Sequence, residues 1–392
     1  MTGASPSSIL STIGAFGNPG PVRDPKTLPE YQSICIAATD LLPQRMRSSL
    51  GHASARNSRR VPTPEDRVKV FVTGGAGFIG SHLVRRLLTQ REITAITVYD
   101  NFSSGSTGHL AAMRDDPKLT TIEGDIGHLG MLTHAMAGMD LVFHLAANPD
   151  IAKAVRQPDI DFWEGTYLTQ NVLEAMRVTG AGAILYTSGS GVYGEVPGTT
   201  FAESFGPCIP ISTYGASKLA CEALIASYCH MFSIRGRAFR FANVVGPRQT
   251  HGVGHDFIRR LRSDRGKLRV LGDGTQLKSY IYIDDVLDAM FLVHRRMCGT
   301  GEKPFDIFNV ATDDYITVTQ IADIACDVAG LAPGSVEYLY TGGDRGWRGD
   351  VPKIVFDLAK IKGLGWMARR TSSEAIRESI AAMHSELAKG CP

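Results

Sequence analysis

A glycine-rich turn near residue 75 constrains the fold of this chain more than any other feature. Residues 69–81 read KVFVTGGAGFIGS, an apolar β-branched run that breaks into glycines and resumes as an amphipathic stretch. Gly74, Gly77 and Gly80 recur at intervals of three residues. Such a turn lets the backbone approach a pyrophosphate, whose charge then lies at the N-terminus of a helix. The pattern therefore predicts a strand, a tight turn and a helix start that together bind a dinucleotide.

An acidic residue follows at the distance that this kind of site requires. The next apolar run, AITVYD, ends in Asp100, twenty residues after Gly80. A carboxylate in this place accepts a hydrogen bond from the 2′-hydroxyl of the ribose. A glycine run alone is weak evidence, but a strand before it and an acid after it make the prediction of a dinucleotide fold a strong one.

Composition narrows the class of protein. The 392 residues carry a net charge of +2, and 20% of them are charged, so nothing favours a nucleic acid or a membrane surface as a partner. The seven cysteines form no CxxC pair, which argues against a disulfide framework or a zinc site, and reduced thiols suit the cytosol. No apolar run approaches the ~20 residues that span a bilayer. We expect a soluble, cytoplasmic protein without a metal centre.

The first 66 residues differ from the rest of the chain. They are rich in Ser, Pro, Gly and Arg and show weak periodicity, which is typical of segments with little order. Because they contain Ser and Arg and few acids, an organelle transit peptide is one interpretation. A dispensable tail, or a start placed too far upstream, is the interpretation that we favour for an unpatterned terminus.

From residue 67 onward, strands alternate with helices. Near-continuous apolar strands such as VKVFVTG and AGAILYTSG are separated by amphipathic stretches. This alternation predicts an α/β fold with a doubly wound parallel sheet of the Rossmann type, covered by helices on both faces. We place this domain at residues 67–245. Residues 246–392 have shorter strands, including FDIFNV, and predict a smaller mixed α/β lobe over the strand C-termini, where ligands of such sheets bind.

A tyrosine and a lysine lie one helical turn apart after the fifth predicted strand. The segment STYGASK begins a long amphipathic stretch, and residues at i and i+4 share a helix face, so Tyr214 and Lys218 present a phenol beside an ammonium. A neighbouring cation, together with an oxidised nicotinamide ring, favours the phenolate. A phenolate can take a hydroxyl proton while hydride leaves the same carbon for the cofactor. The pair therefore predicts hydride-transfer chemistry.

Several motifs, taken in order, resemble those of the extended short-chain dehydrogenase/reductases. They are TGGAGFIGSHL, YDNFSSG, HLAAN, TSGSGVYGE, STYGASK and RFANVVGPR. Within this superfamily the chain is most similar to the UDP-glucose 4-epimerase group of nucleotide-sugar enzymes. The resemblance runs from about residue 67 to the C-terminus and is much more specific for the superfamily than for the substrate.

The resemblance assigns cofactor-binding roles by position. It implies NAD rather than NADP, because no arginine follows Asp100 to receive a 2′-phosphate. It places Gly74, Gly77, Phe78, Ile79 and Gly80 at the pyrophosphate, Asp100, Asn101, Ser103, Ser104 and Gly105 at the adenosine ribose, Asp125 and Ile126 at the adenine, Leu145, Ala146 and Ala147 behind the cofactor, and Tyr214 and Lys218 at its reactive end.

The same resemblance implies how a nucleotide-sugar substrate is held. Asn243 corresponds to a residue that touches the substrate diphosphate, and Lys278 occupies a place where the family often has an arginine. The glycine-rich stretch GGDRGWRGDVP offers Arg345 and Arg348 as further diphosphate partners. The resemblance also implies a homodimer, formed through two helices of each subunit.

Two positions depart from the family pattern. The Ser or Thr that contacts the reacting hydroxyl, four residues before Tyr193, is here Gly189. Either flanking serine could supply the hydroxyl. We expect Ser190 to be catalytic and Ser188 to contribute at most to substrate binding, because adjacent strand residues point to opposite faces and Ser188 would face away. The second departure is Gly165, in the place of an asparagine that faces the nicotinamide.

The residues before Tyr193 also distinguish among reactions. Dehydratases of the family carry an Asp-Glu pair just before the VYG motif, and decarboxylases carry a Glu, whereas this chain has Ser190 and Gly191. Elimination would lack its acid and base, so we expect an NAD-dependent 4-epimerase, of the UDP-glucose/UDP-galactose type. A dehydratase or oxidoreductase acting on a nucleotide sugar remains an alternative, and so does a non-catalytic NAD-binding relative.

Two loop histidines complete the candidate residues. His251 and His255 lie in the sequence HGVGH, without a carboxylate or cysteine at metal spacing. A role in a substrate loop, or none beyond the surface, is favoured over a metal site.

Overall fold

The computed structural model describes residues 67–297 and 303–388. The expectations for residues 1–66 therefore lie outside the described residues. Among the residues described, no helix is long and apolar enough to cross a membrane, and no group of His, Cys, Asp or Glu side chains has the arrangement of a metal site.

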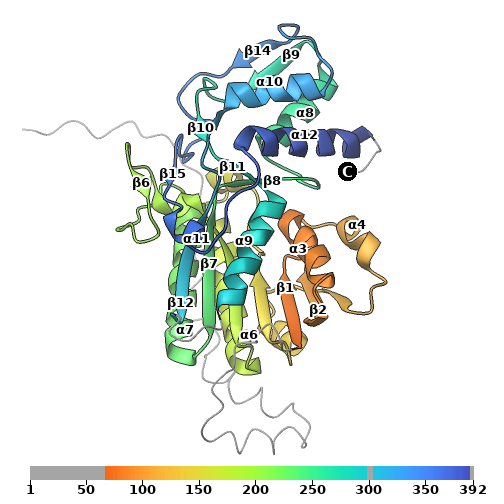
Figure 1. Ribbon diagram of the computed structural model, residues 1–392, viewed down its shortest axis with the longest axis vertical. Helices are drawn as coiled ribbons and strands as arrows, with labels where there is room; N and C mark the ends of the chain where they lie inside the picture. The colour runs from red at the N-terminus through yellow and green to blue at the C-terminus, as the bar shows by residue number, and fades with distance from the viewer. Residues whose placement is uncertain (1–66, 298–302, 389–392) are drawn as a thin grey trace, which may run out of the picture. The chain divides into compact units, whose positions relative to one another are not determined.

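A seven-stranded parallel sheet forms the centre of the fold (Figure 1). Its strands are, in spatial order, β12 (Phe305–Val310), β7 (Arg235–Phe241), β5 (Ala183–Gly189), β4 (Leu141–His144), β1 (Val68–Thr73), β2 (Ile93–Asp100) and β3 (Leu119–Glu123). The chain runs outward from β1 in both directions, so the strand order reverses between β1 and β4. In open sheets of this kind, ligands bind beyond the carboxyl ends of the strands at such a reversal.

Helices cover both faces of the sheet, as predicted. The alternation of β1 explains this arrangement, because Val70 and Val72 contribute to one apolar core and Phe71 to the other. The first core includes α3 (Phe78–Leu88) and α9 (Ile283–Arg296), and the second includes α5 (Leu129–Met136), α6 (Leu168–Thr179) and α7 (Thr213–Phe232). Strands buried on both faces account for the near-continuous apolar runs of the sequence.

The C-terminal lobe is built mainly from short strands and three helices (Figure 1). Its elements are α8 (Val253–Ser263), α10 (Val318–Val328), α12 (Ser372–Ala388) and the parallel pair β9 (Lys267–Val270) and β14 (Glu337–Tyr340). Smaller pairs join β11 (Tyr280–Tyr282) to β8 (Asn243–Val245), β10 (Leu277–Lys278) to β13 (Ile316–Thr317), and β15 (Val355–Phe356) to β6 (Thr200–Phe201).

Short helical segments complete the described chain. They are α4 (Thr107–Leu110), α11 (Ala359–Gly363), the 3-10 helices η2 (Ala111–Met113), η3 (Ile151–Val155) and η5 (Ser190–Tyr193), and the π-helix η4 (Phe162–Tyr167).

The boundary at residue 245 divides the fold less cleanly than expected. β12 lies within the stretch that we placed in the lobe, yet it pairs in register with β7 at the edge of the central sheet. α9, from the same stretch, packs against the sheet beside α3. The physical reason is that β12 can bury both its faces only by extending the sheet, so the chain returns from the lobe to complete it.

Candidate active site

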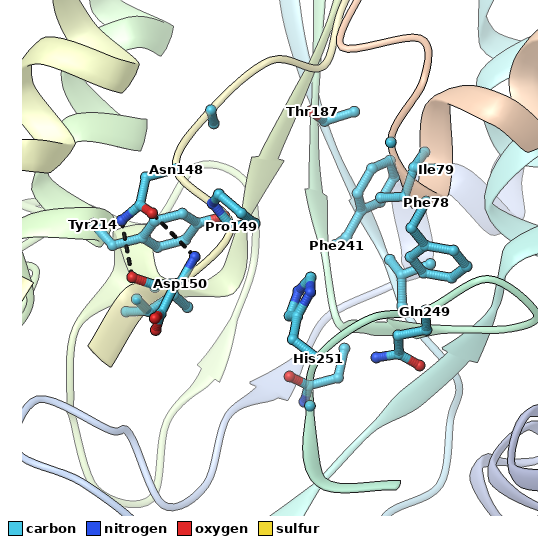
Figure 2. A pocket seen from close by; sticks show the side chains of 18 of the residues that line it. Phe78, Ile79, Asn148, Pro149, Asp150, Thr187, Tyr214, Phe241, Gln249 and His251 are labelled. Carbon is cyan, nitrogen blue, oxygen red and sulfur yellow. Dashed lines mark hydrogen bonds between the residues drawn. The ribbon is translucent and has the colours of Figure 1, made fainter. Parts of the chain in front are cut away.

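A cavity of about 880 Å³ opens beyond the carboxyl ends of the central strands. One wall comes from the β1–α3 turn and the ends of β2, β4 and β5, and the other comes from the loop before α8 and from lobe residues near 271–280 and 346–356. Figure 2 shows side chains from both walls pointing into the same space.

The glycine turn brings backbone to the cavity surface. Gly74 adopts φ +71°, a left-handed conformation that favours glycine. A Cβ on Gly80 would lie 2.2 Å from the carbonyl oxygen of Gly74, so the turn and the helix pack backbone against backbone. α3 begins without a side-chain cap, and its first residues, Phe78 and Ile79, line the cavity with Gly77 and Gly80. Free N–H groups of a first helical turn are suited to an anionic phosphate.

Asp100 holds the glycine turn in place at the end of β2. One carboxylate oxygen accepts a hydrogen bond from the Ala76 N–H at 2.9 Å, and the other accepts one from the Phe102 N–H at 2.9 Å. The carboxylate is largely buried but borders the cavity. Its remaining acceptor capacity suits the ribose role that the sequence predicted.

Most of the predicted cofactor residues line the cavity, and two do not. Asn101, Ser103, Ser104, Ile126, Leu145, Ala146 and Ala147 all line it. Gly105 instead packs on Ala76, where a Cβ would lie 2.9 Å from the alanine Cβ. The Asp125 carboxylate accepts hydrogen bonds from the Gly127 N–H at 2.7 Å and from the Asn101 side-chain amide at 3.3 Å. Gly105 and Asp125 therefore support residues that border the cavity without lining it themselves.

A buried histidine supports the wall behind the predicted cofactor. His144 is fully buried at the end of β4, with Nδ1 2.7 Å from Thr73 Oγ1 and Nε2 2.9 Å from Thr169 Oγ1. Desolvation, with a smaller contribution from Lys218, lowers the pKa of His144 to about 3. The imidazole is therefore neutral and structural.

The Tyr214–Lys218 pair lies on the first turns of α7, as its spacing predicted. The Ser212 hydroxyl caps this helix by accepting a hydrogen bond from the Gly215 N–H. The Lys218 ammonium lies 5.5 Å from the centre of the Tyr214 ring and donates to the Thr187 carbonyl oxygen at 2.8 Å. Lys218 is buried, whereas Tyr214 borders the cavity (Figure 2). A cation is thus fixed beside a phenol that a ligand can reach.

A buried ion pair anchors this helix one turn further along. Glu222 accepts hydrogen bonds from Arg240 of β7 at 3.0 and 2.6 Å and from the Ser188 hydroxyl at 2.6 Å. The Arg240 guanidinium also lies 4.6 Å from the centre of the Tyr193 ring. Sequence reasoning missed this pair, because its residues come from two separate elements: Arg240 begins the motif RFANVVGPR, whereas Glu222 lies beyond the end of STYGASK. The spacing of Glu222 four residues after Lys218 is the signal that could have found it.

The two serines at the end of β5 differ in their contacts. Ser188 borders the cavity, but its buried hydroxyl donates a hydrogen bond to Glu222 at 2.6 Å. Ser190 begins η5, where alternation ends, and borders the cavity. No hydrogen bond joins the Ser190 hydroxyl to another described residue.

The two glycines that depart from the family pattern differ in their surroundings. A Cβ on Gly165 would lie 2.3 Å from the Ser217 hydroxyl oxygen, which donates to the Asp161 carbonyl oxygen at 2.6 Å. Packing of η4 against α7 therefore requires a glycine there. A Cβ on Gly189 would meet nothing closer than Tyr214 Cε1 at 4.0 Å, and its backbone is extended. The fold does not require glycine at position 189.

The sugar wall differs from the sequence prediction at two arginines. Asn243 lines the cavity, and so does Lys278, which pairs with Asp350. Arg345 instead pairs with Glu195 and with Asp344, and neither it nor the exposed Arg348 lines the cavity. The same loop presents Trp347 to the cavity instead. Nearby carboxylates, Glu195 and Asp344, hold the Arg345 guanidinium away from it.

Three polar or aromatic residues of this wall were not predicted. Trp347, from the same loop as the two arginines, lines the cavity together with Gln276 and Arg260. The Arg260 guanidinium is held by the Arg269 carbonyl oxygen at 2.6 Å. These residues come from three separate segments of the lobe, so no local motif marks them.

Comparison with known proteins agrees with this geometry. Residues 70–311 match the NAD dependent epimerase/dehydratase family. The chain belongs to this family. It is 30% identical to the UDP-glucose 4-epimerase of Mycolicibacterium smegmatis over 321 residues, which cover 80% of this chain and 97% of the relative.

Solved structures of family members share the fold and differ in reaction. A UDP-glucose 4-epimerase from Thermotoga maritima, solved with UDP-glucose, is 28% identical with a TM-score of 0.71, over 82% of this chain and all of that one. A dTDP-glucose 4,6-dehydratase from Streptomyces venezuelae, solved with NAD, is 26% identical with a TM-score of 0.73, over 82% and 98% of the two chains.

The cofactor of this epimerase/dehydratase family member is NAD. The residues present fit it, because the uncapped start of α3 and the backbone of Gly77 and Gly80 border the cavity, and so does the Asp100 carboxylate, an acceptor for a ribose hydroxyl. Lys218 and Tyr214 lie at the other end of the same cavity.

Proposed function

We propose that this enzyme is an NAD-dependent nucleotide-sugar 4-epimerase that acts on a UDP-hexose and interconverts UDP-glucose and UDP-galactose. One observation carries the proposal. Tyr214 and Lys218 are present at the cavity, while Ser190 and Gly191 stand where related dehydratases carry a carboxylate pair. Reversible hydride transfer needs the first pair alone, whereas elimination needs an acid and a base as well.

The chain's own residues would perform the proton transfer. Bound NAD would supply the acceptor for the hydride of C4 and the source of its return. Lys218, fixed by the Thr187 carbonyl, stabilises the phenolate form of Tyr214. That phenolate takes the proton of the C4 hydroxyl and becomes a neutral phenol. Ser190, whose hydroxyl faces the cavity without a described partner, would hold the C4 oxygen in the role of the missing residue at 189.

The lobe would hold the diphosphate while the sugar turns. Asn243 and Lys278 border the cavity from β8 and β10 and would bind the phosphate oxygens, with Lys278 leaving Asp350 to do so. Rotation of the sugar about its diphosphate then presents the other face of the C4 ketone to the same hydride. This step requires an anchor at the diphosphate and a roomy sugar wall.

A homodimer is part of the proposal. α6 and α7 pack side by side, joined by a hydrogen bond of 2.6 Å from Gln170 to the Tyr228 hydroxyl. Near these helices, Trp163, Val178 and Met231 are each at least half exposed. Large apolar side chains on adjacent helices support an interface between two copies. Analytical ultracentrifugation tests this, and a Met231→Glu variant is expected to shift a dimer toward monomer.

The test of the function is an incubation of the purified protein with UDP-glucose and NAD, followed by analysis of the sugars. UDP-galactose without net NADH is the expected result. A persistent 4-keto-6-deoxy product would instead identify a dehydratase, and stoichiometric NADH a net oxidoreductase. Retained NAD binding without turnover of UDP-glucose, UDP-glucuronic acid or their N-acetylated analogues would favour a non-catalytic relative.

A further inference from the structure

Two titratable side chains in the cavity take no part in the hydride step. Asp150 follows the end of β4, and His251 lies in the loop before α8. Figure 2 shows His251 pointing into the cavity, with Asp150 and Tyr214 at the other side of the same space. A sugar whose C4 touches Tyr214 would therefore meet both groups at its neighbouring atoms.

Asp150 is held in a fixed place relative to Tyr214. The Asn148 side chain clamps its backbone, accepting from the Asp150 N–H at 3.0 Å and donating to its carbonyl oxygen at 2.9 Å. The same amide donates to the Asp161 carboxylate at 2.9 Å, and that carboxylate accepts from the Thr213 hydroxyl at 2.7 Å. Thr213 directly precedes Tyr214. No described residue hydrogen-bonds the Asp150 carboxylate, which is left for a ligand.

His251 is also positioned by contacts on both sides of its loop. The Arg248 N–H donates to Glu386 of α12 at 3.0 Å, and the Arg248 guanidinium donates to the His109 carbonyl oxygen at 3.2 Å. On the ring itself, Nδ1 lies 3.4 Å from the Thr250 hydroxyl oxygen. If Thr250 accepts from Nδ1–H, Nε2 carries a lone pair that can take a proton.

The electrostatic surroundings disfavour the charged form of this imidazole. The residue is exposed to the cavity, and desolvation, followed by the neighbouring His255, lowers the pKa of His251. Asp150 and Asp256 act in the opposite direction. The side chain that opposes Tyr214 is thus an uncharged base faced by a carboxylate.

We propose that His251, with Asp150 across the cavity, moves a proton at the carbon next to the C4 ketone of a nucleotide-linked hexose. This inference extends the proposed function, because the ketone is the product of the step at Tyr214. It gives the enzyme a second activity, which is proton exchange or inversion at C3 or C5. His251 and Asp150 would serve there as the acid–base pair, because the chain has no carboxylates before Val192.

The step balances without a further reagent. A C–H bond next to the ketone breaks, its electron pair forms a C=C bond to the carbonyl carbon, and the carbonyl π electrons move to oxygen as an enolate. Nε2 of His251 takes the proton, and the Asp150 carboxylate stabilises the imidazolium through the field it already exerts on the ring. Return of a proton from the His251 imidazolium to the same face restores the ketone with its hydrogen exchanged. Protonation of the enolate by solvent water on the opposite face gives the inverted ketone, and the imidazolium then loses its proton to solvent.

The experiment supplies the ketone directly, so that hydride transfer is not needed. The Tyr214→Phe protein, loaded with NAD, is incubated in D2O with UDP-4-keto-6-deoxyglucose, and deuterium at C3 and C5 is followed by NMR. We expect exchange well above that in buffer alone. His251→Gln on the same background is expected to lower the rate about 100-fold, the lower range for a general base, and Asp150→Asn about tenfold.

A matched control comes from the other histidine of the loop. His255 lies beside Asp256 and does not line the cavity, so His255→Gln is expected to exchange like its parent. Exchange no faster than in buffer, or exchange that survives His251→Gln, overturns the inference. Epimerisation of UDP-glucose by the wild-type protein without ketone exchange would leave the proposed function alone standing, and exchange without epimerisation would leave this inference alone standing. Far-ultraviolet circular dichroism of each variant verifies that it is folded.

Discussion

The two walls of the cavity expose different kinds of chemical group. The predicted cofactor wall presents backbone and uncharged side chains of the sheet ends and of the first turn of α3, such as Gly77, Phe78 and Ala146, with Asp100 as its carboxylate. The sugar wall presents long, charged or aromatic side chains from separate segments, such as Lys278 and Trp347. Backbone held by a sheet gives one fixed shape, whereas side chains on loops can be exchanged without rebuilding the fold. The difference explains how one family can keep its cofactor and vary its reaction.

The largest expected effect is on turnover and comes from Tyr214, which borders the cavity on α7. Tyr214→Phe keeps the ring but removes the hydroxyl, so turnover of UDP-glucose should fall about 10²- to 10⁴-fold, the usual contribution of a general acid–base. NAD affinity should stay within a few-fold of wild type, since the cofactor wall is untouched. Steady-state kinetics and fluorescence titration with NADH measure the two quantities. Full retained activity would refute the mechanism.

Low pH should reduce the free energy of unfolding through His144, the buried histidine behind the predicted cofactor site. The unfolded chain binds a proton at His144 with a pKa of 6.5, whereas the folded chain does so only near pH 3. Stability is therefore complete above pH 6.5 and is lost as the pH falls toward 3, by at most about 1.4 kcal/mol per pH unit for this group. Urea unfolding between pH 7 and pH 5 measures the loss. His144→Gln, which cannot titrate, should show a shallower dependence, and an equal slope would exclude this histidine as a cause.

A methyl group on the glycine turn should damage the cofactor wall selectively. The Cβ of Gly80→Ala would lie 2.2 Å from a backbone oxygen that cannot move away cheaply. Overpacking of this kind costs about 1–3 kcal/mol, and we expect weaker NAD binding together with a lower Tm. Isothermal titration with NAD provides the measurement. Gly189→Ala is the matched control, because its Cβ would have room. Equal losses in both variants would contradict the contrast drawn here.

The smallest effect concerns the sugar end. Gly189→Ser restores a hydroxyl at a position where a Cβ lies 4.0 Å from Tyr214 Cε1. We expect kcat to rise several-fold with little change in stability, since the backbone there is extended and open. On a Ser190→Ala background the gain should be larger if Ser190 supplies the hydroxyl in the wild type. A fall in kcat in both backgrounds would show that the space itself is needed by the substrate.

The contrast between the walls also explains what could be read from the sequence. The turn at Gly74–Gly80, Asp100 and the Tyr214–Lys218 pair are local patterns, so their geometry follows from strand and helix periodicity. The partners of Arg345 and Lys278 lie 150 and 72 residues away in the chain, and no local pattern marks such pairs. For that reason both arginines of the GDRGWRGD stretch were assigned to the cavity, while Trp347, which borders it, was not.

The sheet edge provides the same lesson at the level of the fold. β12 was assigned to the lobe because it follows lobe segments in sequence, yet it pairs with β7 at the edge of the central sheet. Sequence order indicates which elements are consecutive but not when the chain returns to an earlier layer. The cytoplasmic location expected from composition stays a prediction.

Deletion of a single residue from the π-helix η4 would change the geometry of the neighbouring cavity wall. A π turn is one residue wider than an α turn, so deletion of one residue within Phe162–Tyr167 would leave a regular α-helix. Residues on one side of the deletion would then rotate by about 100° about the helix axis. Asp161, which joins Asn148 to Thr213, would turn away from both. A deletion here would thus change how the Asp150 loop is held against α7, while the glycine turn, which lies in a separate part of the chain, would keep its contacts.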